Sequence, residues 1–275
     1  IYDEFGSGVA AAESIRSFLQ YAKNNWQTAP GYVLLIGDAT YDPRNYLGFG
    51  FFNFVPAKIV DTTFMQTGSD DALADFNDDG LAELAVGRIP IRNAAGVTTI
   101  LAKTTAFEQG LAQAPSRGAL CASDLPRGYD FQALCNRIFQ SFPGTLGVPQ
   151  SHLNRVESDS RAALLNAASQ GKYIINYSGH GTLTAWEGNW YSSTDVPSLT
   201  NTNANLTLWI MLTCLNGYYV EPSRDGLAEA LIKKTEGGAV ASWTSSGETT
   251  PDVQEIMAKR FYDQIAANTT IKRVG

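Results

Sequence analysis

Residues 173–181 read YIINYSGHG, and residues 208–217 read LWIMLTCLNG. Each run has the nearly continuous apolar composition of a strand buried in a parallel sheet, and each ends in a turn that contains glycine. The first turn carries His180 and the second carries Cys214. Reactive groups of open α/β sheets collect beyond the carboxyl ends of the strands. A thiol and an imidazole at two such ends are therefore expected to act as a nucleophile and its base, provided that the strands are neighbours.

The rest of the chain alternates strand-like runs with segments of helical period, which is typical of an α/β protein. Residues 37–55 are rich in glycine and aromatic side chains and are predicted to form a loop. The pattern restarts near Ala114, which predicts two subdomains over residues 1–114 and 115–275. Strands are predicted at 33–36, 84–86, 119–122 and 238–242, and helices at 9–23, 94–111, 131–142, 161–169, 226–234 and 253–265.

The composition narrows the class of protein. The 275 residues are 44% hydrophobic and 17% charged, which is ordinary for a soluble globular chain. A net charge of −7 argues against a surface for nucleic acid or anionic membranes. No apolar stretch approaches the roughly 20 residues of a membrane span. The chain begins at Ile1 without a leader segment, so it is expected to be a piece of a longer precursor.

Cysteine and histidine are scarce. Cys121, Cys135 and Cys214 cannot all pair and form no C-x-x-C motif, which argues against a disulfide framework and a structural zinc site. Cys121 and Cys135 fit a strand and an amphipathic helix, so both are expected in the core. Only His152 and His180 could serve as a catalytic base. His152 stands in a polar stretch and is expected to be exposed.

The two turns supply the parts of a thiol mechanism. A thiol with a pKa of about 8.5 is mostly protonated at neutral pH, so it needs a base. An imidazole can take that proton and later give it to a leaving amine. Gly181 lets a backbone N–H approach the reacting carbonyl, and the N–H of Cys214 is the natural second donor to an oxyanion. The Asn216-Gly217 pair then permits a sharp turn out of the strand.

The turn SGHG at 178–181, followed by CLNG at 214–217, resembles the caspase–haemoglobinase group of cysteine peptidases. Within that group it is most similar to the gingipain-like peptidases, whose pattern is His-Gly followed by a strand ending in a catalytic Cys-x-Asn-Gly. The resemblance runs over residues 32–263 and implies a smaller α/β subdomain followed by a caspase-like α/β/α sandwich with a mainly parallel sheet. Its landmarks are LIGD at 35–38, SDD at 69–71, VGRIP at 86–90, TAW at 184–186 and GGAV at 237–240.

The same resemblance implies roles for residues around the dyad. Asp124 matches the acid that orients the catalytic histidine, although a turn aspartate would look the same. Asp130 matches a pocket acid of the arginine-specific members and could pair with arginine or lysine, but it also suits a helix N-terminus. Glu248 stands where those members carry a pocket tryptophan, so it either makes the pocket more acidic or reflects a shifted loop. Trp186, with its neighbours Trp190 and Tyr191, either walls a peptide cleft or packs a loop onto the sheet.

Residues 75–83 read DFNDDGLAE, with oxygen side chains at alternate positions and glycine at the sixth. This is the first half of an EF-hand-type loop, but the twelfth position is Val86, so no full EF-hand exists. We expect a structural calcium ion held by Asp75, Asn77, Asp79 and Glu83, with a remote acid such as Asp70 or Asp71 as a further candidate. Catalysis needs no cofactor in this interpretation.

The prediction is a cysteine endopeptidase that cleaves polypeptides through a thioester acyl-enzyme, with arginine or lysine before the cut. The precursor is expected to be secreted or surface-displayed, with pro- and C-terminal domains on either side. One alternative is a sorting-signal peptidase or transpeptidase of a secretion system, which would share the dyad. Another is a catalytically silent domain used for binding or assembly.

Overall fold

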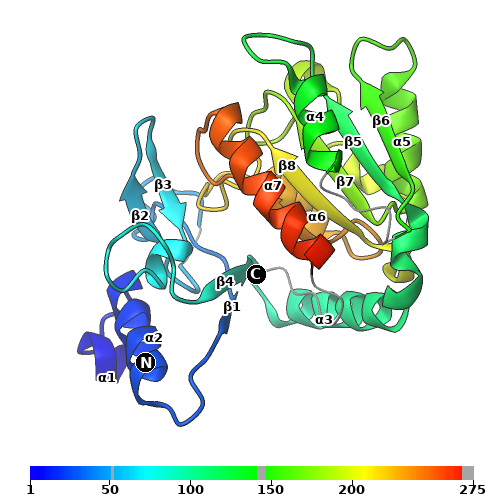
Figure 1. Cartoon of the computed structure of the whole chain (residues 1–275). Helices are drawn as coiled ribbons and strands as arrows, with labels where there is room; N and C mark the ends of the chain where they lie inside the picture. The colour runs from blue at the N-terminus through cyan, green and yellow to red at the C-terminus, as the bar shows by residue number, and fades with distance from the viewer. Residues whose placement is uncertain (51–52, 141–146, 268–275) are drawn as a thin grey trace. The chain divides into compact units, whose positions relative to one another are not determined.

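The computed structural model describes residues 1–50, 53–140 and 147–267 (Figure 1). The chain forms two compact units. Of the described residues, the first unit contains Ile1–Ala94 together with Tyr218–Arg224, and the second contains Ala95–Gly217 together with residues 225–267. No helix among the described residues is long and apolar enough to cross a membrane.

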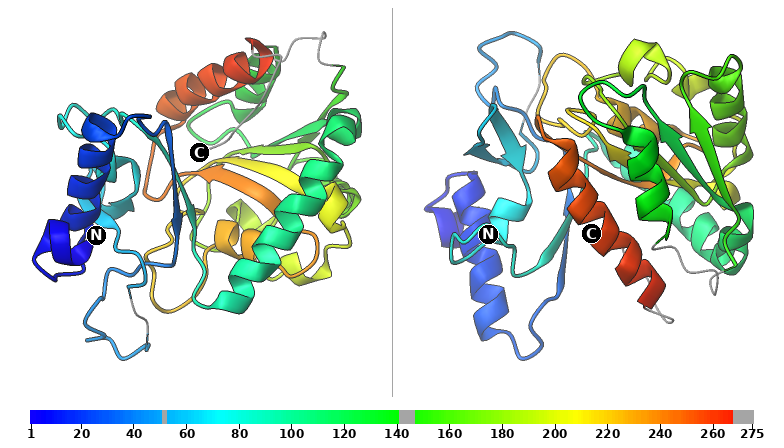
Figure 2. Two further views of the ribbon diagram at one scale, coloured as in Figure 1. Left: turned by 90° about the horizontal axis from the view of Figure 1, so that it is seen from below. Right: turned by 45° about the horizontal axis from the view of Figure 1, so that its top comes forward.

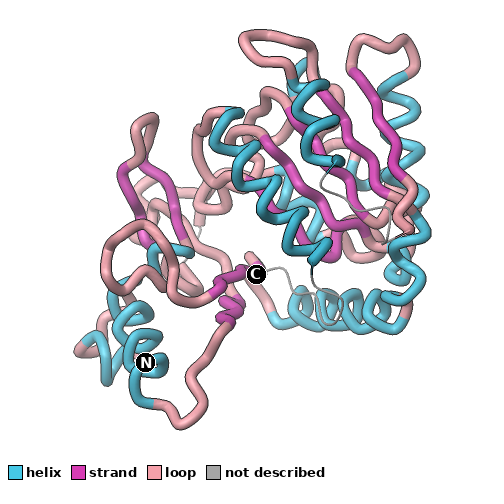
Figure 3. Tube along the Cα trace, viewed as in Figure 1, coloured by secondary structure: helices cyan, strands magenta, loops and turns pink. Residues whose placement is uncertain are grey.

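The second unit is built on a five-stranded sheet in the order β6-β5-β7-β8-β9, whose strands are magenta in Figure 3. Every pairing in this sheet is parallel. All residues of the two adjacent strands β7 and β8 are buried, which explains their nearly continuous apolar sequences. The strands are β5 (Ala119–Ser123), β6 (Gln150–Asn154), β7 (Ile174–Ser178), β8 (Thr207–Leu212) and β9 (Ala239–Thr244).

Helices cover both faces of this sheet, as Figures 1 and 2 show. Helices α4 (Phe131–Gln140) and α7 (Pro251–Ala267) pack on one face, against alternate residues of β8 such as Leu208 and Ile210. Helices α5 (Ser160–Gln170) and α6 (Leu227–Lys233) pack on the other face, against Trp209 and Met211. The period of two along the strand therefore produces the predicted α/β/α sandwich.

Helix α3 (Ala94–Gln109) belongs with this sandwich. Its Phe107 packs with Ala114 and Leu206, and its Lys103 donates hydrogen bonds to the carbonyls of Ile232 and Lys234 at the end of α6. The division between the units therefore falls at residue 94 and not near the predicted position 114, because α3 buries its apolar face in the second core. Short 3-10 helices lie at Asp71–Leu73, Leu111–Arg117, Glu187–Asn189, Val196–Ser198 and Asn203–Asn205.

The first unit is a smaller α/β arrangement. Helices α1 (Tyr2–Gly6) and α2 (Ala12–Asn25) accompany the parallel pair β1 (Tyr32–Ile36) and β4 (Ala85–Ile89). Strands β2 (Lys58–Asp61) and β3 (Gln66–Ser69) form an antiparallel hairpin. The segment Tyr218–Arg224 is fixed in this unit by hydrogen bonds to Asp70. Arg88 donates two hydrogen bonds of 2.7 Å to the Asp70 carboxylate, and the Tyr219 hydroxyl donates to the same carboxylate.

Several local predictions differ from the structure. Strand β1 is only partly buried, since Leu34 and Ile36 are exposed. The apolar side chains of Val9 and Leu101 were expected to face inward from the predicted helices, but Val9 precedes α2 and both are exposed. The hairpin of β2 and β3 and the edge strand β6 were missed because their sequences are polar and short. Of the predicted helix 131–142, positions 141 and 142 lie outside the described residues, as do positions 51 and 52 of the predicted loop.

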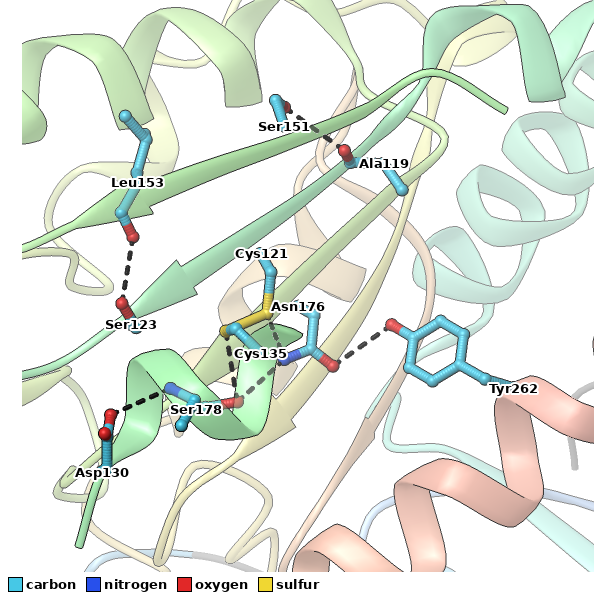
Figure 4. The surroundings of a disulfide bond; sticks show 11 residues. Ala119, Cys121, Ser123, Asp130, Cys135, Ser151, Leu153, Asn176, Ser178 and Tyr262 are labelled. Atoms are coloured by element: carbon cyan, nitrogen blue, oxygen red, sulfur yellow. Dashed lines mark hydrogen bonds between the residues drawn. A yellow bond between two sulfur atoms is a disulfide. The ribbon is translucent and has the colours of Figure 1, made fainter. Parts of the chain in front are cut away.

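Cys121 of β5 and Cys135 of α4 form a disulfide, which the argument against a disulfide framework did not anticipate (Figure 4). Both are buried as predicted, and burial is what brings them together. The Asn176 amide donates to Cys121 Sγ across 3.4 Å and to Ser178 Oγ across 3.1 Å, while the Tyr262 hydroxyl donates to the Asn176 carbonyl oxygen. The spacing of the two cysteines matches no known motif, which is why the sequence does not reveal the bond.

Candidate active site

The register of the adjacent strands β7 and β8 brings His180 and Cys214 to the same end of the sheet, just beyond the carboxyl ends of both strands. Ser178 pairs with Leu212 in the parallel ladder, and each candidate residue follows its member of that pair by two positions. The N–H of Gly179 continues the ladder by donating to the carbonyl of Leu212 across 3.2 Å. The strands are thus neighbours, which meets the condition set by the sequence.

The glycines on either side of His180 are required by close packing. A side chain at Gly179 would clash with Asp124 and with the Tyr177 hydroxyl, and one at Gly181 would clash with Thr213. Thr213 directly precedes Cys214, so the Gly181 backbone lies against the strand end that carries the thiol. Among the described residues, no hydrogen bond uses the N–H of Gly181 or of Cys214. Both donors therefore remain able to bind an oxygen placed at this edge.

The His180 side chain is exposed at the sheet edge, while its backbone is fixed. Its Nε2 lies 3.3 Å from the carbonyl oxygen of Arg127, and its ring packs edge-on against Phe131 with centroids 5.3 Å apart. The carbonyl of His180 accepts hydrogen bonds from the Tyr177 hydroxyl at 2.7 Å and from the N–H of Glu187 at 2.9 Å. Burial raises the pKa of Tyr177 well above its usual value, so this hydroxyl remains a donor.

Asp124 contacts the backbone of His180 and makes no hydrogen bond with its ring, contrary to the expected role as the residue that orients the imidazole. Its carboxylate is fully buried and accepts a 3.2 Å hydrogen bond from the N–H of His180. The other carboxylate oxygen binds Nε of Arg155 and the N–H of Leu125, each at 2.6 Å. Asp124 therefore fixes the chain that carries the histidine, and the carbonyl of Arg127 faces the ring.

Cys214 is half-buried and is the one cysteine outside the disulfide. Its Sγ lies 3.5 Å from the carbonyl oxygen of Thr249, in the loop that follows β9. The next residue, Leu215, has a φ of 62°, and the N–H of Asn216 donates to the carbonyl of Cys214 across 2.8 Å. A non-glycine residue in this region is uncommon and is found where neighbouring structure holds it.

The sharp turn after the strand is thus centred on Leu215, not on the Asn216-Gly217 pair as predicted. Gly217 has a different reason to be glycine, because a side chain there would clash with Thr244.

The two predicted pocket acids are both exposed. Asp130 caps helix α4, since its Oδ1 accepts the N–H of Ala133 at 2.9 Å (Figure 4). The next residue along the chain is Phe131, which touches the His180 ring. Glu248 precedes Thr249, whose carbonyl contacts the thiol. Neither acid is the buried carboxylate expected for a closed pocket, but each lies one residue from a contact of the dyad.

Trp186 is buried, which does not fit the substrate contact expected of it. It is 1% exposed and stacks on Tyr177 with ring centroids 4.0 Å apart. Trp190 and Tyr191 lie in the same apolar cluster, together with Trp209 of β8. The aromatic residues after His180 therefore pack the loop onto the sheet, which is the second of the two alternatives.

His152 lies on the edge strand β6 and is exposed, as expected. Its ring packs edge-on against Phe139, and partial burial lowers its pKa. It pairs with Cys121 in the middle of β5, away from the carboxyl end of the sheet. His180 is thus the histidine at the same sheet edge as Cys214.

The acidic loop of the first unit brings together the expected metal ligands. Carboxylate oxygens of Asp75, Asp79 and Glu83 all lie within 4.8 Å of one another. Asn77 belongs to the same turn, since its Oδ1 accepts the N–H of Asp79 at 3.0 Å and its amide donates to the Asp79 carboxylate. Hard, anionic oxygens are the donors that Ca²⁺ prefers, so this set fits such an ion.

The sequence did not reveal three contacts of the site. Two are backbone carbonyls, those of Arg127 and Thr249, which carry no signal in the residue type. The third is the side chain of Asn216, which bonds to groups on the loop that follows His180. Its place in CLNG was the available signal, but it was interpreted only as a turn residue.

The parallel sheet between two layers of helices, with an imidazole and a thiol beyond the carboxyl ends of two adjacent strands, has the architecture of a caspase-like fold. The whole chain, residues 1–275, matches peptidase family C25, and the protein belongs to that family. The resemblance to the gingipain-like peptidases is therefore confirmed.

Two relatives from Porphyromonas gingivalis are gingipain R2 and gingipain R1, each 30% identical over 114 residues. That match covers 37% of this chain but only 15% and 11% of those proteins. The crystal structure of the Arg-specific cysteine proteinase gingipain R superposes with a TM-score of 0.78 at 20% identity, covering 97% of this chain and 60% of that one. The complex of Porphyromonas gingivalis RgpB pro- and mature domains superposes with a TM-score of 0.77 at 20% identity, covering 98% of this chain and 62% of that one. These structures establish the fold.

Proposed function

We propose that this chain is a cysteine endopeptidase that uses Cys214 and His180. The register of β7 and β8 carries the proposal, because it sets the two residues at equal offsets beyond one paired position. The Cys214 thiol loses its proton to the imidazole of His180, and the sulfur attacks the scissile carbonyl carbon. The N–H groups of Gly181 and Cys214 bind the resulting oxyanion.

Collapse of this intermediate breaks the C–N bond, and His180 protonates the departing amine. The acyl group is then held as a thioester on Cys214. A water molecule gives a proton to His180 and attacks the thioester carbonyl, which releases the carboxylic acid and restores the thiol. Membership of family C25 supports this chemistry, and each step uses a group that lies at the sheet edge.

We propose further that the substrates are polypeptides with arginine or lysine before the cut. Asp130 and Glu248 support this, since both are solvent-accessible carboxylates beside contacts of the dyad, and a guanidinium pairs well with carboxylates. A solved structure of similar fold is titled an Arg-specific proteinase. Secretion or surface display, with pro- and C-terminal domains in the precursor, remains part of the same proposal.

A calcium ion bound by Asp75, Asn77, Asp79 and Glu83 is proposed as a structural component of the first unit. The convergence of three carboxylates supports it. The ion would offset their mutual repulsion and fix the turn before β4. It takes no part in the chemistry at Cys214.

The decisive test compares the wild-type protein with Cys214→Ala on a peptide library. Wild-type protein should cleave after arginine or lysine and lose activity on treatment with iodoacetamide, whereas Cys214→Ala should be inactive at an unchanged melting temperature. Cleavage by Cys214→Ala at the wild-type rate would overturn the proposal. Cleavage or acyl transfer at a single sequence would instead indicate a sorting enzyme, and a folded protein whose Cys214 resists alkylation would indicate a silent domain.

A further inference from the structure

We propose that Asn216 is a positioning residue that couples the His180 turn to the Cys214 turn, so that its side-chain amide sets the separation of the imidazole and the thiol. The inference rests on the proposed peptidase function. His180 and Cys214 lie on separate loops at the ends of separate strands, so a third group must fix the distance between the imidazole and the thiol.

The contacts of the Asn216 amide span the two loops. Its Nδ2 donates to the carbonyl of Thr182 across 2.6 Å, and its Oδ1 accepts from Nε1 of Trp186 across 3.0 Å. Thr182 and Trp186 belong to the turn that follows His180, and this turn is closed by the hydrogen bond from the N–H of Thr182 to the carbonyl of Ala185 at 2.8 Å. Both ends of one amide are therefore used on the histidine loop.

The backbone of Asn216 holds the cysteine loop at the same time. Its N–H closes the tight turn onto the carbonyl of Cys214 at 2.8 Å, and its carbonyl accepts the N–H of Ala228 in helix α6 at 3.1 Å. The adjacent N–H of Leu227 donates to the carbonyl of Leu183, on the histidine loop, at 2.9 Å. The start of α6 thus joins the same two loops a second time.

Burial makes this connection stiff. Asn216 is 0% exposed and Trp186 is 1% exposed, so water cannot replace their hydrogen bond. A buried amide left without its partners costs more than the bond itself contributes, so the native pairing is strongly preferred. Leu215 is the single residue between Cys214 and Asn216 and has a φ of 62°, so fixing Asn216 also fixes the backbone of Cys214.

Three variants separate positioning from simple stabilisation. Asn216→Asp keeps the shape but replaces the Nδ2 donor with an oxygen that faces the carbonyl of Thr182. Trp186→Phe removes the Nε1 donor together with the five-membered ring of the indole and leaves an aromatic ring beside Tyr177, so the melting temperature is needed to account for the lost packing. The matched control is Asn201→Asp, because Asn201 is also buried, donates to the carbonyls of Asn205 and Gly238, and accepts the N–H of Gly238. The hydrogen bonds of Asn201 to Gly238 lie just before β9, at the amino ends of the strands, whereas Cys214 lies beyond their carboxyl ends.

Four quantities are measured for each protein: kcat and KM on one arginyl peptide, the ratio of the Cys214 alkylation rates by iodoacetamide at pH 7 and pH 9, and the melting temperature. Asn216→Asp should lower kcat on the order of a hundredfold with little change in KM, because small misplacements of reacting groups cost about this much. Its alkylation ratio should fall, since the imidazole no longer assists the thiol at pH 7. Trp186→Phe should lower kcat about tenfold. Asn201→Asp should change neither kcat nor the alkylation ratio.

The inference is overturned if Asn216→Asp and Asn201→Asp share the same kcat and alkylation ratio while wild-type Cys214 is reactive and the enzyme cleaves. If Asn216→Asp does not fold, Trp186→Phe decides the question by the same two readouts. A wild-type protein whose Cys214 is not alkylated, or an active Cys214→Ala variant, would overturn the peptidase function and this inference together. The two failures are therefore distinguishable.

Discussion

The buried carboxylate of Asp124 holds the backbone N–H of His180 at 3.2 Å and leaves the imidazole to the carbonyl of Arg127. The histidine is therefore fixed from two sides, with its main chain on a charged group and its ring on a neutral acceptor. A neutral acceptor favours a defined ring orientation without adding a full negative charge to the site. Asp124 in turn is paired with Arg155, so an ion pair adjoins the turn that carries His180.

Asp124→Asn should cost mainly stability. Removing the charge leaves the largely buried guanidinium of Arg155 without its counter-ion, which is expected to lower the free energy of unfolding by about 3 kcal/mol. Urea denaturation measures this loss, and kcat at a temperature where the variant is folded should fall much less than in Cys214→Ala. The double variant Asp124→Asn/Arg155→Gln should recover part of the stability. A large loss of kcat at unchanged stability would instead mean that Asp124 acts on the ring.

Asp130→Asn tests the basic pocket without disturbing the helix cap, because asparagine and aspartate cap helices about equally well. Loss of the charge should reduce kcat/KM for arginyl peptides about tenfold or more, with the melting temperature unchanged. Asp130→Ala should show the same kinetic effect and, in addition, lose about 1 kcal/mol of stability through the missing cap. Glu248→Gln tests the second acid in the same assay. Unchanged kcat/KM in both charge variants would show that neither carboxylate binds the substrate.

The disulfide between Cys121 and Cys135 should be a stability element of the second unit. The two cysteines are 14 positions apart, and closing a loop of this size stabilises a protein by about 3 kcal/mol. The double variant Cys121→Ala/Cys135→Ala should therefore melt about 6 to 12 °C lower than the wild-type protein. Cys214→Ala, which keeps the bond, serves as the control. Equal melting temperatures for all three proteins would rule out this contribution.

Stability should rise between pH 8 and about pH 10 because of Lys103. Burial, with a smaller contribution from the charge of Lys234, lowers the pKa of Lys103 to about 8. In the unfolded chain a lysine titrates near 10.4, so between these values the unfolded state binds more protons and rising pH favours folding. Below pH 8 the full cost of the buried charge persists.

Lys103→Met removes this titration. The difference in unfolding free energy between the wild type and the variant should therefore change by about 1 to 3 kcal/mol over that window. Taking the difference cancels the other groups that titrate there. Parallel stability curves for the two proteins would contradict the assignment.

Calcium should stabilise the first unit if the acidic turn binds it. Adding Ca²⁺ to chelator-treated protein is expected to raise the melting temperature of the wild type but not of Asp75→Asn/Asp79→Asn, because the variant lacks two of the converging carboxylates. Glu108→Gln, which removes one exposed charge from α3, should respond like the wild type. An equal shift in all three proteins would show that calcium acts elsewhere.

The apolar runs that end at His180 and Cys214 determine the α/β class and identify the two candidate catalytic residues, since buried parallel strands and their glycine turns are local patterns. The helices α4 to α7 follow from periodicity for the same reason. The polar edge strand β6, the β2–β3 hairpin and the position of α3 could not be predicted in this way. Their residues acquire a role only from the element that lies beside them.

The sequence by itself determined the two candidate catalytic side chains, because each lies in a short segment whose composition and glycines are visible in the chain. The tertiary structure decided which groups surround them: the carbonyl at the His180 ring, the backbone bond of Asp124, the burial of Trp186, the disulfide and the amide of Asn216. Each of these depends on a contact between segments far apart along the chain. Such contacts depend on how strands and helices pack, and they cannot be predicted from the residue type alone.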